Sequence, residues 1–393
     1  MSKSEHRITV GPYQLTSPVL FASYRLGDFP TSGLRRFPWA MTRTEALLIN
    51  AYDFTRPKYR KWLENGWNPE SYLSFARKPI LIDSGAYYFR KKDNITVSPE
   101  GILDIQLRSQ ADVGVVLDHP FPPDAQDKAQ RIATTIRNTD TMLSHLLEVG
   151  ADIDVMPAIH GHTKRAIRGC IKKYRHLADK YNLPLLDHVG IGSLAPLAQT
   201  GDIKLAASVI HEVRRELPTS QIHCFSMGSA LLMLLAFYSG ADSVDSQSWI
   251  VSAGFKLAQL PGYYVVRMGK KEYNDETKFR EAMRKFRHRL KYIHEKEQYT
   301  VKDWNTGKLL DISDAASREQ YVESLVDLKS NEHVHNRACH NLWTYNFEVR
   351  QYRDAMKRGV LDDFLKARLA STRYKAAFEH AMDLRKSRKP KKR

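Results

Sequence analysis

Carboxylates recur in this sequence directly after short apolar runs. Two aspartates do so: Asp83 follows residues 79–82 and Asp118 follows 113–117, and Asp245 ends a further strand-like segment, 243–245. Apolar runs without polar alternation are typical of buried parallel strands. Sheets and barrels of the α/β class hold their chemistry at the carboxyl ends of such strands. A single strand-end aspartate would more simply cap the turn that follows it, but the repetition predicts a shared site.

Three carboxylates at one rim must share protons or bind a group that is cationic or donates hydrogen bonds. Paired carboxylates suit cleavage at the anomeric carbon of a sugar, where one attacks and another moves a proton to or from the leaving group. No histidine cluster accompanies all three, so a metal hydrolase is the weaker interpretation. Tyr87 and Met227 would hold a base as leaving group, so the pattern favours glycosidic-bond chemistry on a nucleic acid.

The elements that would position these carboxylates alternate between strand and helix. Strand-like runs cover 17–24, 79–83, 113–118, 153–159, 188–193, 221–225 and 243–245. A helix is expected over 44–52, and residues 263–267 read as one more strand. Neither a GxGxxG turn nor a phosphate-binding P-loop is present. So many βα units in one block favour a (β/α)8 barrel over a doubly wound sheet.

We therefore predict an α/β fold, a (β/α)8 TIM barrel with a basic helical insertion and a helical C-terminal part. The expected boundaries are a catalytic barrel core over 1–262, a basic insertion over 263–300, a helical part over 301–384 that completes the barrel, and a basic tail over 385–393.

The chain has 393 residues and a formal net charge of +17, which points to a polyanionic partner, most often nucleic acid. The alternative is a basic surface without such a partner. The candidate nucleic-acid contacts are Lys270, Lys271, Arg284, Arg287, Arg289 and Lys291. The 3 cysteines are far apart and form no CxxC pair, and no apolar run is long enough to span a membrane. We expect a cytoplasmic protein, in the host cytoplasm if phage-encoded, without a membrane partner.

Several short motifs, taken in order, resemble those of the tRNA-guanine transglycosylase superfamily. Residues 82–87 resemble its DSGG(F/Y) motif, 118–120 its base-recognition element, and His160-Gly161 falls where the family has Gln-Gly. Further matches are 192–194 to the GGL turn, 227–229 to MGVG, 240–245 to the nucleophile segment and 340–341 to the HN element.

The resemblance implies a role for each matching residue. Asp245 would attack the anomeric carbon and hold the sugar covalently, and Asp83 would act as general acid and base. Asp242 is the competing nucleophile, less favoured because the strand only starts there. The implied substrate-binding residues are Asp118 on the purine edge, Tyr87 and Met227 on the ring faces, and His160, Gly192, Ser193 and Gly228 around the base.

The chain also departs from the family pattern. The zinc-binding CxCxxC is absent, and His333, His335, Cys339 and His340 are weak replacements because they are crowded. We therefore expect no metal and no cofactor, with zinc as the alternative. The tRNA-reading Pro-Thr-Arg of the family is replaced by Ser246-Gln247-Ser248.

Such a combination is most similar to the DNA-guanine transglycosylases of phages and bacterial modification islands, which implies DNA modification and restriction evasion. The expected reaction exchanges guanine in DNA for a free 7-deazaguanine base, 7-cyano-7-deazaguanine or a derivative. Alternatives are a tRNA-guanine transglycosylase of the queuine or archaeosine type, and a non-catalytic nucleic-acid-binding subunit. A homodimer or a helper protein would be a further partner. Retention of Asp83 and Asp245 argues against the non-catalytic alternative.

Overall fold

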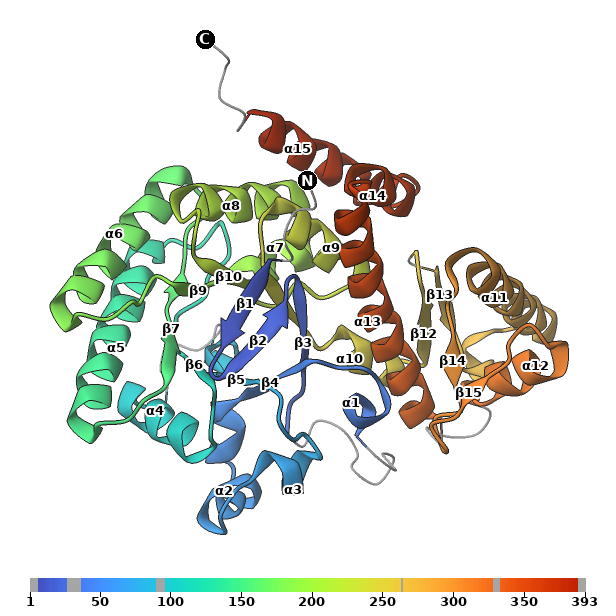
Figure 1. The fold of residues 1–393 in the computed structure, drawn as a ribbon, viewed down its shortest axis with the longest axis horizontal. Coiled ribbons are helices and arrows are strands. Elements are labelled where there is room, and N and C mark those ends of the chain that lie inside the picture. The colour runs from blue at the N-terminus through green and yellow to red at the C-terminus, as the bar shows by residue number, and fades with distance from the viewer. Residues whose placement is uncertain (1–5, 27–36, 90–95, 263, 328–332, 388–393) are drawn as a thin grey trace.

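The parallel strands of this chain close into a barrel, as the computed structural model in Figure 1 shows for residues 6–26, 37–89, 96–262, 264–327 and 333–387. Their order in the sheet is β7-β6-β5-β4-β3-β11-β10-β9-β8. The strands are β3 (Val19–Ser23), β4 (Ala46–Asn50), β5 (Ile80–Asp83), β6 (Val113–Val115), β7 (Asp154–Met156), β8 (Ala158–Ile159), β9 (His188–Ile191), β10 (Gln221–Cys224) and β11 (Ser243–Ser246).

The two end segments of the sheet, β7 and β8, are halves of one strand interrupted at Pro157, which has no N–H to donate. On one side, the Val116 N–H donates to the Met156 carbonyl at 3.2 Å. On the other side, the Gly190 N–H donates to the Pro157 carbonyl at 2.9 Å. The nine segments therefore make eight strands that close on themselves, and the predicted (β/α)8 barrel is confirmed.

One barrel strand was predicted wrongly. Residues 44–52 were expected as a helix, but β4 is a strand that pairs in parallel with β3 and β5, and all five of its residues are buried. Residues 263–267 were expected as a further strand of the repeat. Instead β13 (Tyr264–Arg267) pairs antiparallel with β12 (Leu257–Leu260), outside the barrel. The barrel strand that the sequence interpretation lacked is therefore β4 and not residues 263–267.

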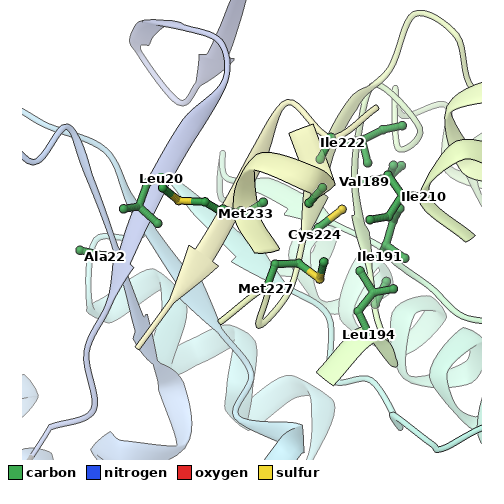
Figure 2. Packing of buried hydrophobic residues seen from close by; sticks show 14 of the residues in the cluster. Leu20, Ala22, Val189, Ile191, Leu194, Ile210, Ile222, Cys224, Met227 and Met233 are labelled. Carbon is green, nitrogen blue, oxygen red and sulfur yellow. The ribbon is translucent and has the colours of Figure 1, made fainter. Parts of the chain in front are cut away.

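Helices cover the outside of the barrel (Figure 1), and their inner faces pack against outward-facing strand residues such as Leu20, Val189 and Ile191 (Figure 2). The Ser98 hydroxyl caps the first turn of α4 by accepting the Gly101 N–H at 3.0 Å. The helices of the barrel region are α1 (Pro38–Met41), α2 (Pro57–Glu64), α3 (Pro69–Leu73), α4 (Pro99–Arg108), α5 (Lys128–Val149), α6 (Lys164–Tyr181), α7 (Leu194–Thr200), α8 (Ile203–Glu216), α9 (Ala230–Ser239) and α10 (Ser248–Gly254).

An N-terminal hairpin covers the amino end of the barrel. It consists of β1 (Arg7–Val10) and β2 (Tyr13–Thr16). Its side chains Ile8 and Val10 belong to the same buried cluster as the barrel residues Phe21 and Leu81. With the amino end filled in this way, a site has room at the carboxyl ends of the strands.

A second, smaller core lies on the far side of α13 (Val334–Arg358) from the barrel (Figure 1). It joins β12 and β13 to α11 (Glu276–Glu297), β14 (Val301–Lys302), β15 (Leu309–Leu310) and α12 (Ala315–Glu323). The hairpin β12–β13 spans the boundary that was predicted at residue 262.

The chain then returns to the barrel. Helices α14 (Leu361–Leu369) and α15 (Lys375–Ser387) lie against α8 and α9, where the Tyr238 hydroxyl donates to Asp362 at 2.9 Å. A helical C-terminal part is thus confirmed, but it does not complete the barrel as expected, because the barrel strands all lie between Val19 and Ser246. No helix in the described ranges has the length and apolar character that a bilayer crossing requires.

Candidate active site

A cavity of about 620 Å³ lies at the carboxyl ends of the barrel strands, a volume typical of small-ligand sites. Seven of the nine residues predicted to act in catalysis and substrate binding line this cavity, and His160 and Met227 do not. The seven are Asp83, Asp245, Asp118, Tyr87, Gly192, Ser193 and Gly228. The structure therefore brings together carboxylates that are far apart in the sequence.

Asp83 ends β5 and is held by the tight turn that follows. The Gly85 N–H donates to Asp83 Oδ2 at 3.3 Å. Gly85 has φ +83°, a backbone conformation that favours glycine, and a Cβ at this position would lie 2.6 Å from Tyr52 Cβ. Both the backbone conformation and the lack of space therefore require glycine here. The turn leads into the short helix η3 (Ala86–Phe89), which carries Tyr87 on the cavity wall, where its hydroxyl contacts Gln199 Nε2 at 2.5 Å.

Burial, and after it the nearby carboxylates Asp118 and Asp245, together raise the pKa of Asp83 from 3.8 to about 8. Both causes disfavour the charged form, while the backbone hydrogen bonds from Ser84 and Gly85 oppose them. Asp83 is therefore protonated at neutral pH and can give a proton to a leaving group.

Asp245 lies on β11 and is oriented through one oxygen. Its Oδ1 accepts the Ser226 N–H at 2.6 Å and lies 3.5 Å from His223 Nε2. The pKa of His223 is lowered because the ring is fully buried. With both contacts on Oδ1, the arrangement leaves Oδ2 for attack on a group bound in the cavity.

Asp242, the competing nucleophile, lies at the opposite end of β11 and does not line the cavity. Its Oδ2 accepts the Ile222 N–H at 2.8 Å and pairs with Arg214, and its Oδ1 lies 3.2 Å from His6 Nε2. Arg214 also donates to the carbonyls of Gly240 at 2.9 Å and Ser220 at 2.7 Å. These contacts give Asp242 a structural role at the amino end of the barrel.

Replacing Asp242 with alanine is expected to lower the free energy of unfolding by about 3 kcal/mol, because the partly buried Arg214 guanidinium would lose its carboxylate. Urea denaturation would measure the change. The matched control is Asp140→Ala, which removes the exposed ion pair with Lys180 and should cost no more than about 1 kcal/mol. Equal losses in the two variants would contradict this assignment.

His160 was predicted to contact substrate, but it lies fully buried behind the cavity wall. The Phe121 N–H donates to Ser193 Oγ at 3.0 Å, and Ser193 Oγ lies 2.9 Å from His160 Nδ1. The Phe121 N–H can only donate, so we assign Nδ1 as the acceptor of the hydroxyl proton, which puts the ring proton on Nε2. Nε2 lies 3.1 Å from Asp118 Oδ2 without the alignment of a hydrogen bond, so the His160 ring lies behind Asp118 and limits where that carboxylate can move.

Glycine at position 192 makes room for this arrangement. A Cβ on Gly192 would lie 2.2 Å from His160 Cε1. Such a contact is far inside van der Waals range, so a side chain at 192 and a histidine at 160 cannot occupy this site together.

Met227 was predicted to stack on the substrate, but it is 1% exposed and packs in the core with Cys224 and Leu194 (Figure 2). Its neighbour Phe225 lines the cavity instead and supplies a flat apolar surface. Sequence reasoning also missed wall residues from distant segments: Arg25, Asn50, Gln199, Ser226, Arg373 and Tyr374. Arg25 and Asn50 follow or end barrel strands, which was a usable signal, whereas Arg373 and Tyr374 have no strand-end pattern.

The four weak zinc candidates do not form a ligand set. His335 Nε2 lies 3.6 Å from Cys339 Sγ, whereas His340 Nδ1 is 2.6 Å from the Tyr321 hydroxyl. Burial raises the pKa of the Cys339 thiol and lowers that of His340 to about 3. Among the described residues no three His, Cys, Asp or Glu side chains are arranged to hold a metal ion, and His333 only precedes α13.

The basic residues predicted to bind nucleic acid lie on or beside α11, and most contact carboxylates or rings. The pairs are Lys270 with Glu276, Arg284 with Glu281, Arg287 with Glu319 and Lys291 with Glu295, while Arg289 lies over the Tyr292 ring and Lys271 is exposed. Exposed pairs of this kind hold their partners weakly. Binding of nucleic acid by this helix stays a prediction.

The comparisons with known proteins agree with this geometry. The family model for queuine tRNA-ribosyltransferase (TGT) matches residues 14–298. The chain is 24% identical over 332 residues to the tRNA-guanine(15) transglycosylase of Methanococcus vannielii, which is 84% of this chain and 45% of that protein. It is 27% identical over 209 residues to the protein of that name from Archaeoglobus fulgidus, which is 53% of this chain and 42% of that protein.

The chain thus spans less than half the length of these curated relatives. The family match nonetheless covers most of the chain, including β3 to β11 and the three cavity aspartates. The chain belongs to the queuine tRNA-ribosyltransferase (TGT) family.

Proposed function

We propose that this protein is a guanine transglycosylase that exchanges guanine in a nucleic acid for a 7-deazaguanine base through a covalent Asp245–sugar intermediate. The observation that carries the proposal is that Asp83 and Asp245 line one cavity, with the pKa of Asp83 raised to about 8. Membership of the family and the names of the relatives support the same reaction.

In the first step, Asp245 Oδ2 forms a bond to C1′ of the target guanosine as the bond from C1′ to the base breaks. The electron pair of the broken bond goes to guanine. Protonated Asp83 transfers its proton to that base, so that neutral guanine leaves and Asp83 becomes a carboxylate. Asp118, at the cavity wall, accepts hydrogen bonds from the purine edge.

In the second step, the Asp83 carboxylate removes the proton from the ring nitrogen of the incoming 7-deazaguanine. This nitrogen attacks C1′ and displaces the Asp245 carboxylate, which restores both aspartates. Tyr87 and Phe225 line the cavity and offer flat surfaces to either base.

The acceptor that the relatives favour is tRNA, since both relatives described above are named tRNA-guanine(15) transglycosylases. DNA was the acceptor expected from the sequence, and it becomes the second candidate. The observation in favour of DNA comes from the sequence of this chain. Ser246-Gln247-Ser248 occupies the position where the family carries its tRNA-reading Pro-Thr-Arg.

Incubation with labelled guanine, and either unmodified tRNA or unmodified DNA, tests the function and the acceptor together. Label in tRNA is expected. Label only in DNA would overturn tRNA as acceptor in favour of the second candidate. Label in neither, with folded protein, would overturn the proposed reaction. Asp245→Asn is the control for non-enzymatic incorporation.

Replacing His160 with alanine is expected to lower kcat/KM by about 10- to 100-fold, because Asp118 loses the ring that lies 3.1 Å behind it and Ser193 loses one of its two partners. His160→Gln, which keeps a donor, should recover part of the loss. Steady-state assays with varied base concentration would measure both. A loss equal in the two variants, with unchanged KM for the base, would contradict a positioning role.

A further inference from the structure

A second hollow of about 320 Å³ adjoins the active-site cavity. Arg25, Gln247 and Val251 line both spaces, so the two lie side by side and share these residues as a common border. Gly254 and Phe255, at the end of α10, form the outer part of the second hollow. A ligand that extends out of the main cavity between these residues would therefore enter it.

This hollow carries unusually exposed apolar surface. The exposed fraction of Phe255 is 69%, the largest among the big apolar side chains of the described residues, and Val251 beside it is 45% exposed. Large apolar side chains exposed beside a polar site are typical of binding surfaces. A ring presented to solvent in this way can stack on a planar group.

The helix that carries Phe255 at its end, α10, is anchored on α13 by hydrogen bonds. Arg337 on α13, itself fully buried, donates from Nε to the Ala253 carbonyl at 3.1 Å. Asn341 on the same helix donates to the Trp249 carbonyl at 3.0 Å. These contacts fix both ends of α10 on α13, so the backbone that carries Phe255 is positioned before any ligand arrives.

We propose that Phe255 is a stacking platform for the nucleobase next to the target guanosine in the substrate strand; this rests on the proposed function. A base that enters the main cavity leaves the stack, and its neighbour loses a stacking partner. Phe255 replaces that partner. Because every base has a flat face, the platform accepts any neighbour and adds affinity without reading sequence.

Arg25 provides the charge that such an occupant requires. It lines both spaces, and its guanidinium lies 4.1 Å from the centre of the Tyr88 ring. A cation at this junction lies where the phosphate between the two nucleotides would pass. Apolar surface for a ring and positive charge for a phosphate fit a nucleotide better than a protein partner.

The test measures exchange with a short oligonucleotide of the accepted type, tRNA-derived or DNA. Phe255→Ala is expected to raise the KM for the oligonucleotide by about 5- to 100-fold with little change in kcat. Phe255→Tyr should restore the wild-type KM. Leu309→Ala, at a residue 64% exposed on β15, is the matched control and should change neither constant.

A second variant fills the hollow instead of emptying it. A Cβ on Gly254 would meet no atom within 4 Å, so Gly254→Leu should fold normally and still exclude the neighbouring base. Oligonucleotides with 2-aminopurine on either side of the target would report the contact directly. Fluorescence should be quenched by the wild-type protein at one flanking position, and the quenching should be lost in both variants.

The outcomes separate the two proposals. An unchanged KM in Phe255→Ala and Gly254→Leu, while the wild type exchanges base, would overturn the platform and leave the reaction intact. Loss of a dimer in these variants at unchanged KM would assign the surface to a second copy of the chain, and would also overturn it. Absence of exchange by folded wild-type protein would overturn the proposed reaction itself.

Discussion

Replacing Asp245 with asparagine is expected to abolish a denaturation-resistant adduct between protein and nucleic acid, and to lower kcat on the order of 10⁴-fold or more. Asparagine has the shape of aspartate and keeps an oxygen for the Ser226 N–H, which lies 2.6 Å from Oδ1 in the native site. The fold should therefore persist. An amide oxygen does not displace a base from C1′, so the first step should fail.

Trapping the complex with substrate and resolving it under denaturing conditions would measure this effect. Asp242→Asn is the matched control, because Asp242 directly precedes the same strand but lies outside the cavity. It should still form the adduct, although with a less stable fold. An adduct that persists in Asp245→Asn and disappears in Asp242→Asn would reverse the assignment of the nucleophile.

Replacing Asp83 with asparagine is expected to block turnover to a comparable extent, because the leaving guanine then receives no proton and the incoming base loses none. In the wild type, kcat/KM should fall as the pH rises through about 8, where Asp83 loses its proton. A pH profile of base exchange would measure this limb. A profile that stays flat from pH 7 to about 9 would contradict the acid role of Asp83.

The same group has a predictable effect on stability. Its folded-state pKa of about 8 lies above the ordinary value of 3.8, so the folded protein holds the proton more tightly than the unfolded chain. The free energy of unfolding should therefore fall as the pH rises between these values, by a few kcal/mol, since one pKa unit corresponds to about 1.4 kcal/mol. Asp83→Asn should lack this fall and be the more stable protein above pH 8, as urea denaturation at two pH values would show.

The barrel could be predicted from the sequence because most of its strands are apolar runs that end at a polar residue or a turn. The strand β4 could not. Its apolar core, Leu47-Leu48-Ile49, is too short for periodicity to separate a buried strand from a buried helix. Only pairing with β3 and β5, which are distant in sequence, settles its conformation.

The sequence allowed us to predict which segments meet at the site. It did not allow us to predict which of their side chains face the cavity. Asp83, Asp118 and Asp245 do line the cavity. His160 follows its strand in the same way, yet it turns behind the wall because Gly192 leaves space there. Such a contact between separate strands has no signature in either segment alone.

Arg373 and Tyr374 line the active-site cavity, and the Tyr374 hydroxyl lies 3.1 Å from Ser229 Oγ, which caps α9. A chain still being synthesised has all three aspartates more than a hundred residues before this part of the wall exists. The nascent polypeptide thus carries all three aspartates before it can complete the pocket. Proteolytic removal of the segment between α14 and α15 would be expected to inactivate a protein whose aspartates are all intact.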